Sequence, residues 1–246
     1  MRLGSRAIDE QERALALFEG AADHRAAALV CSNLAFQWYA VGGYERGEAL
    51  LRQALATARR LGLATIEPLA KQNLGATLAA RGELEEAIRV QTEAAEAFAS
   101  QKDPRLEGYS RVHLALAHAH RGDLEEAARH AELAARGGIE PVMVGARAAL
   151  ARIALVRGDL GAALAHASAA TELLTRLGTI EDFDVLSRIT VADVLEATGD
   201  AAGARKALTR ARDIVETRAK KLKKPELSRS FCEAVSENRE ALRRGR

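Results

Sequence analysis

The sequence predicts an all-α protein: a right-handed alpha-alpha superhelix of about five antiparallel helix pairs. The first observation is a repeated heptapeptide. Residues 81–87 read Arg-Gly-Glu-Leu-Glu-Glu-Ala, close copies occur at 121–127 and 157–163, and weaker copies at 41–47 and 198–204. The second is the order of residues within each copy, where a glycine after an apolar run, followed by an acid, marks the end of one helix and the start of the next. Repetition about every 40 residues is typical of a solenoid.

The first predicted element is a single helix over residues 5–21. Residues 7–18 match residues 87–98, which form the second helix of a later pair. The first helix is therefore either an N-terminal cap or the remaining half of a repeat. We favour the half-repeat, in a chain cut from a longer array, because the match is to an internal helix and not to a polar cap.

The helix pairs follow in order, each with apolar residues at helical spacing, as in Leu74, Leu78, Leu84 and Ile88. The expected pairs cover residues 25–61, 66–100, 105–136, 141–177 and 182–219. Prolines support these bounds, because all four lie near the start of a predicted element, where a missing N–H costs little. A capping helix over residues 225–243 closes the array, and we expect one domain over residues 1–246.

Composition excludes several classes of function. The formal net charge is +2 and the pI is near 8.6, so nothing in the overall charge calls for a nucleic-acid partner. No apolar run approaches the roughly 18 residues of a membrane span. Cys31 and Cys232 lack metal-type spacing and are interpreted as reduced thiols. We expect a cytoplasmic protein that binds neither nucleic acid nor membrane.

Aligned on the turn glycines, the copies resemble the tetratricopeptide repeat (TPR). That family places a large and a small residue in the middle of the first helix, here Leu74 and Gly75, then a turn glycine, here Gly82. Two small residues follow in the second helix, here Ala87 and Ala94. The repeats are spaced 40, 40, 36 and 41 residues apart. This looks like the longer variety found in bacterial signalling proteins and maltose-regulator-type activators.

The resemblance implies that a partner binds on the concave surface, which is lined by the first helix of each pair. From the motif register, we expect Asn33, Asn73 and His113 to form a ladder that hydrogen-bonds the main chain of an extended peptide. Alternatively, the two asparagines only satisfy contacts between helices or with water. The full expected site consists of Asn33, Phe36, Asn73, Tyr109, His113, Leu116, His120 and Arg152. The same register also places Gly145, Ala149, Leu186, Thr190 and Asp193 on this face.

The sequence does not favour a metal site, an enzyme active site or a nucleic-acid patch. His113 and His120 share a helix face but lie about 10 Å apart along the axis, too far to hold one metal ion. His118 points elsewhere on that helix, and no metal site is expected. No sequence signature of an enzyme or phosphate-binding loop is present. The lysines of residues 220–224 are interpreted as a solvated helix end.

The sequence thus predicts a non-enzymatic scaffold without cofactors that holds a protein or peptide partner in its groove, in a bacterial signalling or transcription-regulatory system. The alternative is a structural or dimerisation scaffold that uses its convex face or its exposed first helix. We expect a monomer or a homodimer.

Overall fold

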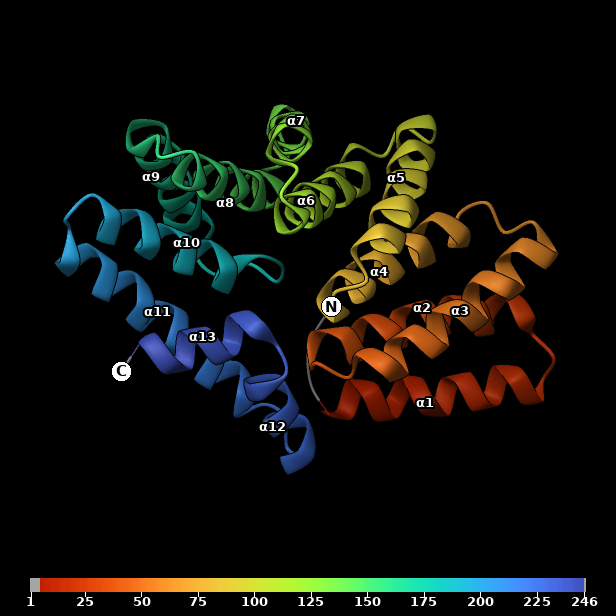
Figure 1. Ribbon diagram of the computed structural model, residues 1–246. Helices are drawn as coiled ribbons and strands as arrows, with labels where there is room; N and C mark the ends of the chain where they lie inside the picture. Colours follow the sequence, from red (N-terminus) through yellow and green to blue (C-terminus); the bar gives the residue numbers. More distant parts are fainter. Residues whose placement is uncertain (1–4, 246) are drawn as a thin grey trace. The chain divides into compact units, whose positions relative to one another are not determined.

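The structure, a computed structural model, describes residues 5–245, and all regular secondary structure in that range is helical (Figure 1). The thirteen helices described are α1 (Ser5–Gly20), α2 (His24–Ala40), α3 (Tyr44–Leu61), α4 (Ile66–Arg81), α5 (Leu84–Ser100), α6 (Pro104–Arg121), α7 (Leu124–Arg136), α8 (Glu140–Val156), α9 (Leu160–Leu177), α10 (Asp184–Ala197), α11 (Ala201–Ala219), α12 (Pro225–Glu233) and α13 (Ser236–Arg244). The all-α repeat fold is confirmed, and each of the five expected pairs begins and ends within two residues of its expected bounds.

The repeated glycines end the first helix of each pair in the left-handed conformation. Gly82 and Gly122 have φ of 87° and 93°, values that glycine adopts without the steric cost of a Cβ. The next residue closes the cap: the Asp123 N–H donates to the carbonyl of His118 at 2.9 Å. The acid then helps the second helix begin, as where the Asp159 carboxylate accepts from the Ala162 N–H at 2.9 Å. The heptapeptide therefore specifies each turn locally.

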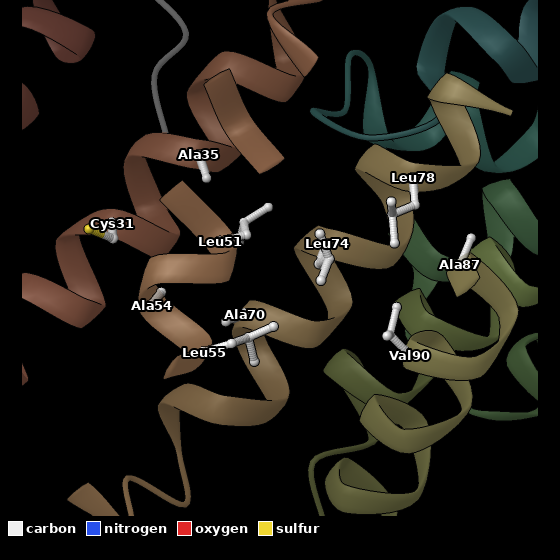
Figure 2. Close-up of a cluster of buried hydrophobic side chains, with 10 residues drawn as sticks. All are labelled: Cys31, Ala35, Leu51, Ala54, Leu55, Ala70, Leu74, Leu78, Ala87 and Val90. Atoms are coloured by element: carbon white, nitrogen blue, oxygen red, sulfur yellow. The ribbon is translucent and has the colours of Figure 1, made fainter. Parts of the chain in front are cut away.

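Small residues let the paired helices approach closely. A Cβ built on Gly75 of α4 would lie 2.4 Å from Cγ of Gln91 on α5. Because Gly75 has no side chain, the Gln91 amide reaches the Gln72 carbonyl and donates to it at 2.8 Å. Figure 2 shows the apolar layer around this crossing, with side chains from four successive helices facing one another. Its buried residues are Cys31, Ala35, Leu51, Ala54, Leu55, Ala70, Leu74, Leu78, Ala87 and Val90.

The chain divides into two compact units. The first contains Met1–Gln101 with Arg218–Val235, and the second contains Lys102–Thr217 with Ser236–Arg246. In the first unit α12 returns to the beginning of the chain, where the Lys224 N–H donates to Oγ of Ser5 on α1 at 3.2 Å. In the second unit α13 packs against α10. The expectation of one domain stays a prediction.

The closing segment differs from its prediction. A single helix was expected over residues 225–243, but α12 ends at Glu233 and α13 begins at Ser236. Leu227 and Phe231 are buried as expected, whereas Val235 lies in the break and is half-buried. The two short helices pack on different partners, because α12 contacts the turn at Gly42 while Arg244 of α13 pairs with Asp193 of α10 at 2.6 Å. Spacing of three apolar residues could not reveal this break.

No helix within residues 5–245 combines the length and the apolar character needed to cross a membrane.

Candidate functional site

The first helix of each pair is buried on most of its surface. Among residues 32–37 of α2, only Asn33 and Phe36 keep exposed area, and among residues 72–78 of α4 only Asn73 does. Neighbouring helices cover the remaining sides. Among the residues expected to line the groove, we call the half-exposed ones the helix-A stripe, which comprises Asn33, Phe36, Asn73, Tyr109, His113, Leu116 and Arg152. These are seven of the eight residues expected to line the groove.

In the first unit, the two asparagines have different surroundings. The Asn73 amide donates to the backbone carbonyl of Ser32 at 3.3 Å and to its Oγ at 3.2 Å. Asn73 therefore joins α4 to α2 by hydrogen bonds, which agrees with the alternative that this asparagine satisfies a contact between helices. The Asn33 side chain makes no hydrogen bond with any residue that the structure describes. Asn33 keeps both the donor and the acceptor of its amide available.

Aromatic side chains extend the stripe beside Asn33. The ring centroids of Phe36 and Tyr39 are 6.3 Å apart, and those of Tyr39 and Tyr44 are 5.9 Å apart. Trp38 on the same helix packs elsewhere: Gly43 approaches its ring so closely that a Cβ there would lie 2.5 Å from Cε3. The Arg46 guanidinium lies 4.4 Å from the Trp38 ring centroid. Trp38 is thus a packing residue, and Phe36 is the aromatic side chain of the stripe in the first unit.

In the second unit, Phe183 covers part of the stripe. Its ring centroid lies 6.0 Å from that of Tyr109 and 5.2 Å from that of His113. Gly145 of α8 makes room for it, since a Cβ there would lie 2.6 Å from Cδ2 of Phe183. Phe183 itself has a φ of 61°, a conformation that is costly for a residue with a bulky side chain. Sequence analysis missed this residue.

One signal in the sequence pointed toward Phe183. The interval between Gly158 and Gly199 is 41 residues, five longer than the interval before it. Part of that extra length lies in the connection between α9 and α10, which ends at Phe183. A long connection between helices often has a functional or structural role. Its length does not show which of its side chains packs on the repeats.

Burial shifts the pKa values of the covered residues. Burial raises the pKa of Tyr109 to about 12, with the negative charge of Asp182 as a second cause. Burial lowers the pKa of His113 to about 4, so this imidazole is neutral at pH 7. A neutral imidazole has one donor and one acceptor nitrogen. His113 can therefore accept or donate a hydrogen bond but does not supply a positive charge.

A polar part of the second unit lies farther along the same helices. Leu116 is half-buried against two apolar clusters, and His120 is exposed at the end of α6. Burial lowers the pKa of His120, the positive charge of Arg152 lowers it further, and Glu237 of α13 acts in the opposite direction. Arg152 forms no ion pair with the described residues. The structure therefore brings His120 near Arg152, with Glu237 as a neighbour that sequence analysis missed.

The face expected on α8 and α10 is partly wrong. Gly145 and Ala149 are buried, as are Leu186 and Thr190. Phe183 covers Gly145, and the Thr190 hydroxyl donates to the carbonyl of Leu186 at 3.0 Å within its own helix. The register identified the correct helices, but the covering segments lie outside the repeat pattern. In the second unit the residues of the expected face that keep exposed area are Tyr109, His113, Leu116, Arg152 and Asp193, with exposed His120 at the end of α6. The Asp193 carboxylate pairs with Arg244.

The histidines are also arranged differently from the single-helix expectation. His113 and His120 do not pair, but His118 lies beside His130 of α7, with ring centroids 5.5 Å apart. Glu126 of α7 is the third member of this group. Distances along one helix could not predict a contact between two helices.

Comparison with known proteins agrees with the repeat architecture. The family described as "MalT-like TPR region" matches residues 4–232. No curated protein matches the chain.

Several solved structures resemble the chain in fold. BtubC (BKLC) from P. vanneervenii superposes with a TM-score of 0.65 at 19% identity, over 86% of this chain and 91% of that one. NprR, solved in complex with its cognate peptide NprX, gives a TM-score of 0.69 at 16% identity, over 96% of this chain and 66% of that one. A Rap protein complexed with Competence and Sporulation Factor gives 0.67 at 17% identity, over 98% and 71%. At these identities the likeness shows the fold alone.

Proposed function

The chain belongs to the MalT-like TPR family, and on that basis we propose that it is a non-enzymatic scaffold that binds a protein or peptide partner through the helix-A stripe. The partner would be an extended segment with apolar side chains, held by main-chain hydrogen bonds. We place this scaffold in the cytoplasm, within a bacterial signalling or transcription-regulatory system, where long TPR arrays of this variety occur. Neither a cofactor nor a nucleic-acid or membrane surface is part of the proposal.

The observation that carries the proposal is the pair of half-exposed side chains in the buried middle of α2. Within residues 32–37, only Asn33 and Phe36 keep exposed area, and they present an amide with free hydrogen-bonding groups and an aromatic ring one turn apart. An amide can pair with the N–H and the C=O of a peptide main chain, and an aromatic side chain supplies much of the energy of such contacts. Among the similar structures, NprR was solved with its cognate peptide NprX and the Rap protein with Competence and Sporulation Factor, which supports use of the fold for binding a partner here.

The second unit would contribute differently. Arg152 is half-buried without an ion-pair partner among the described residues, and His120 lies near it. A guanidinium in this position favours a carboxylate on the partner, because it can donate two parallel hydrogen bonds. We therefore propose an acidic group in the part of the partner that reaches this unit.

Capture from host lysate, read by mass spectrometry, tests the proposal. Asn33→Ala with Phe36→Ala removes the first-unit stripe, and Arg152→Ala removes the second-unit cation. Matched controls on second helices are Gln53→Ala, Leu164→Ala and Arg205→Ala, all at exposed positions. We expect the stripe variants, shown by circular dichroism to be folded, to lose a partner that the controls keep. A partner retained equally by all variants would place binding elsewhere.

A second candidate function rests on apolar residues away from the stripe. Leu17 on α1 is 73% exposed, and Leu160 and Leu164 are exposed one turn apart on α9. Exposed leucines of this kind suit self-association through the first helix or the outer face. Sedimentation of the wild type beside Leu17→Lys and Leu164→Lys decides this candidate. A dimer that either substitution dissociates supports it, and a monomer at all concentrations excludes it.

A further inference from the structure

The hairpin between α6 and α7 brings three potential metal ligands together. His118 lies in the last turn of α6, the chain reverses at Gly122, and Glu126 and His130 lie one turn apart on the same face of α7. One ligand atom from each of the three residues lies within 4.8 Å of the others. All three belong to the second unit. None of them is part of the helix-A stripe.

The two imidazoles lie close enough together to share one ion. Their centroids are 5.5 Å apart and their planes differ by 15°. With Zn–N bonds of about 2.0–2.1 Å and tetrahedral angles, the centroids of two imidazoles on one ion are roughly 5 Å apart. The carboxylate of Glu126 must move closer to His130 before both can bind one ion, because its Oε2 is 3.9 Å from Nε2 of His130. Glu126 is exposed and can make this movement at little cost.

A cation already occupies the space between Glu126 and His130. One terminal nitrogen of the Arg129 guanidinium donates to Oε2 of Glu126 at 2.7 Å and to Nε2 of His130 at 3.0 Å. The guanidinium thus holds the position that a metal ion bound to these two residues would take. The Arg129 side chain is 53% exposed, so it can turn into solvent when it is displaced.

The surroundings keep the histidines ready to bind. The side chains of His118 and His130 are only 8% and 7% exposed, and Nδ1 of His130 is buried without a hydrogen-bond partner among the described residues.

Asp123 supplies an outer contact of the kind found around metal-bound histidines. Its Oδ2 lies 3.4 Å from Nδ1 of His118. A carboxylate beside one imidazole nitrogen favours the tautomer that leaves the other nitrogen free, and orients the ring. Arg121 pairs with the same carboxylate, which keeps Asp123 in place.

We propose that His118, Glu126 and His130 form a binding site for Zn²⁺ or a similar divalent transition metal, which enters by displacing the guanidinium of Arg129. Two imidazoles and a carboxylate are a common three-residue ligand set for zinc, with water in the fourth position. The bound ion joins α6 to α7 and stabilises the hairpin. Arg129 competes with the ion for the same two side chains.

Zinc titration of the full chain, purified without a histidine tag, tests the site. The readouts are competition with a fluorescent zinc chelator and the shift in Tm on adding Zn²⁺. We expect one ion per chain and a rise in Tm, because a ligand that binds only the folded state stabilises it. An unchanged Tm together with no competition for zinc would overturn the proposal.

Variants separate this site from adventitious binding to other histidines. We expect Glu126→Gln and His130→Gln to weaken zinc binding roughly tenfold or more. Glu126→Gln changes an exposed side chain and keeps the readout valid if His130→Gln fails to fold. His24→Gln, at an exposed position outside the group and outside the helix-A stripe, is the matched control and should bind as the wild type does. Equal binding by Glu126→Gln, His130→Gln and the wild type would contradict the assignment.

Arg129→Ala tests the competition directly. Removing the guanidinium frees Glu126 and His130, so we expect zinc to bind several-fold more tightly than to the wild type. Arg136→Ala, at an exposed position at the end of α7, is the control for the loss of one positive charge. A variant at position 129 that binds zinc more weakly, or no better than the control at position 136, would contradict displacement of Arg129.

Discussion

The helix-A stripe is open in the first unit and partly covered in the second, although the repeats follow the same pattern. On α2, Asn33 and Phe36 remain half-exposed, and the Asn33 amide has no hydrogen-bond partner among the described residues. On α6, His113 occupies the position that corresponds to Asn33, but Phe183 packs on His113 and on Tyr109, one turn earlier. The repeat pattern therefore decides which positions face outward. Whether those positions stay accessible depends on connections that do not repeat.

The largest expected effect comes from removing the cover in the second unit. Phe183→Ala deletes a half-buried ring that contacts Tyr109 and His113, and we expect it to lower the free energy of unfolding by about 2–3 kcal/mol. Phe36→Ala, at the open stripe, should cost about 1 kcal/mol or less. Urea denaturation of both variants measures the difference. If both substitutions lowered the free energy of unfolding equally, Phe183 would not be packed more tightly than Phe36.

A smaller effect, on the same cover, tests the role of Gly145. Gly145→Ala adds a methyl group 2.6 Å from Cδ2 of Phe183, and overpacking of this kind costs about 1–3 kcal/mol. In a Phe183→Ala background the clash with the ring disappears, so the cost should fall by at least half. A double-mutant cycle by urea denaturation measures this coupling. If the free-energy costs of Gly145→Ala and Phe183→Ala are additive, the absence of a side chain at Gly145 is not what accommodates the Phe183 ring.

The two units should also differ in their response to acid, since the buried histidines lie in the second. The pKa of His113 and of His130 is about 4 in the folded protein, below the value of about 6.5 in the unfolded chain. Between these values the unfolded chain binds more protons, so stability is lost as pH falls from about 6.5 toward 4. We expect about 1 kcal/mol per histidine between pH 7 and pH 5.5.

Urea denaturation at the two pH values measures this loss, and His113→Gln should remove the share of His113, about 1 kcal/mol. Carboxylates with low pKa values, such as Glu67, contribute mainly at lower pH, because their unfolded values are near 4.5. An unchanged stability between pH 7 and pH 5.5 would mean that these histidines are protonated in the folded state.

The smallest expected effect separates the two asparagines of the first unit. Asn73→Ala loses two hydrogen bonds to Ser32 and should cost about 0.5–1.5 kcal/mol in the free energy of unfolding. Asn33→Ala should change it by less than about 0.5 kcal/mol, because its side chain bonds to no described residue. Thermal denaturation ranks the two. The reverse order would assign the structural role to Asn33.

Sequence reasoning succeeded where the cause is local. The glycine-acid heptapeptide predicts the turns because a left-handed glycine and the following N-terminal acid act within a few residues. The same register predicted eight groove residues, of which seven are half-exposed and His120 is exposed, and their role in binding stays a prediction. The family resemblance rested on the turn glycines and on the small residues of both helices.

The failures have a common cause in contacts between residues distant along the chain. Phe183 reaches Tyr109 across 74 residues, and the pairing of His118 with His130 joins two helices. The break between α12 and α13 depends on separate packing partners at Gly42 and Asp193. Periodicity assigns a residue to one face of its own helix, and it carries no information about the segment that packs there.

Site-specific crosslinking tests the central claim most directly. A photoreactive phenylalanine analogue is placed at position 36 on the stripe, or at position 164 on the outer face of α9 as the control, and the chain is irradiated in host cells. We expect a polypeptide to be crosslinked at position 36 and not at position 164. Asn33→Ala should lower the yield of that crosslink. Crosslinks at position 164 with none at position 36 would contradict binding through the helix-A stripe.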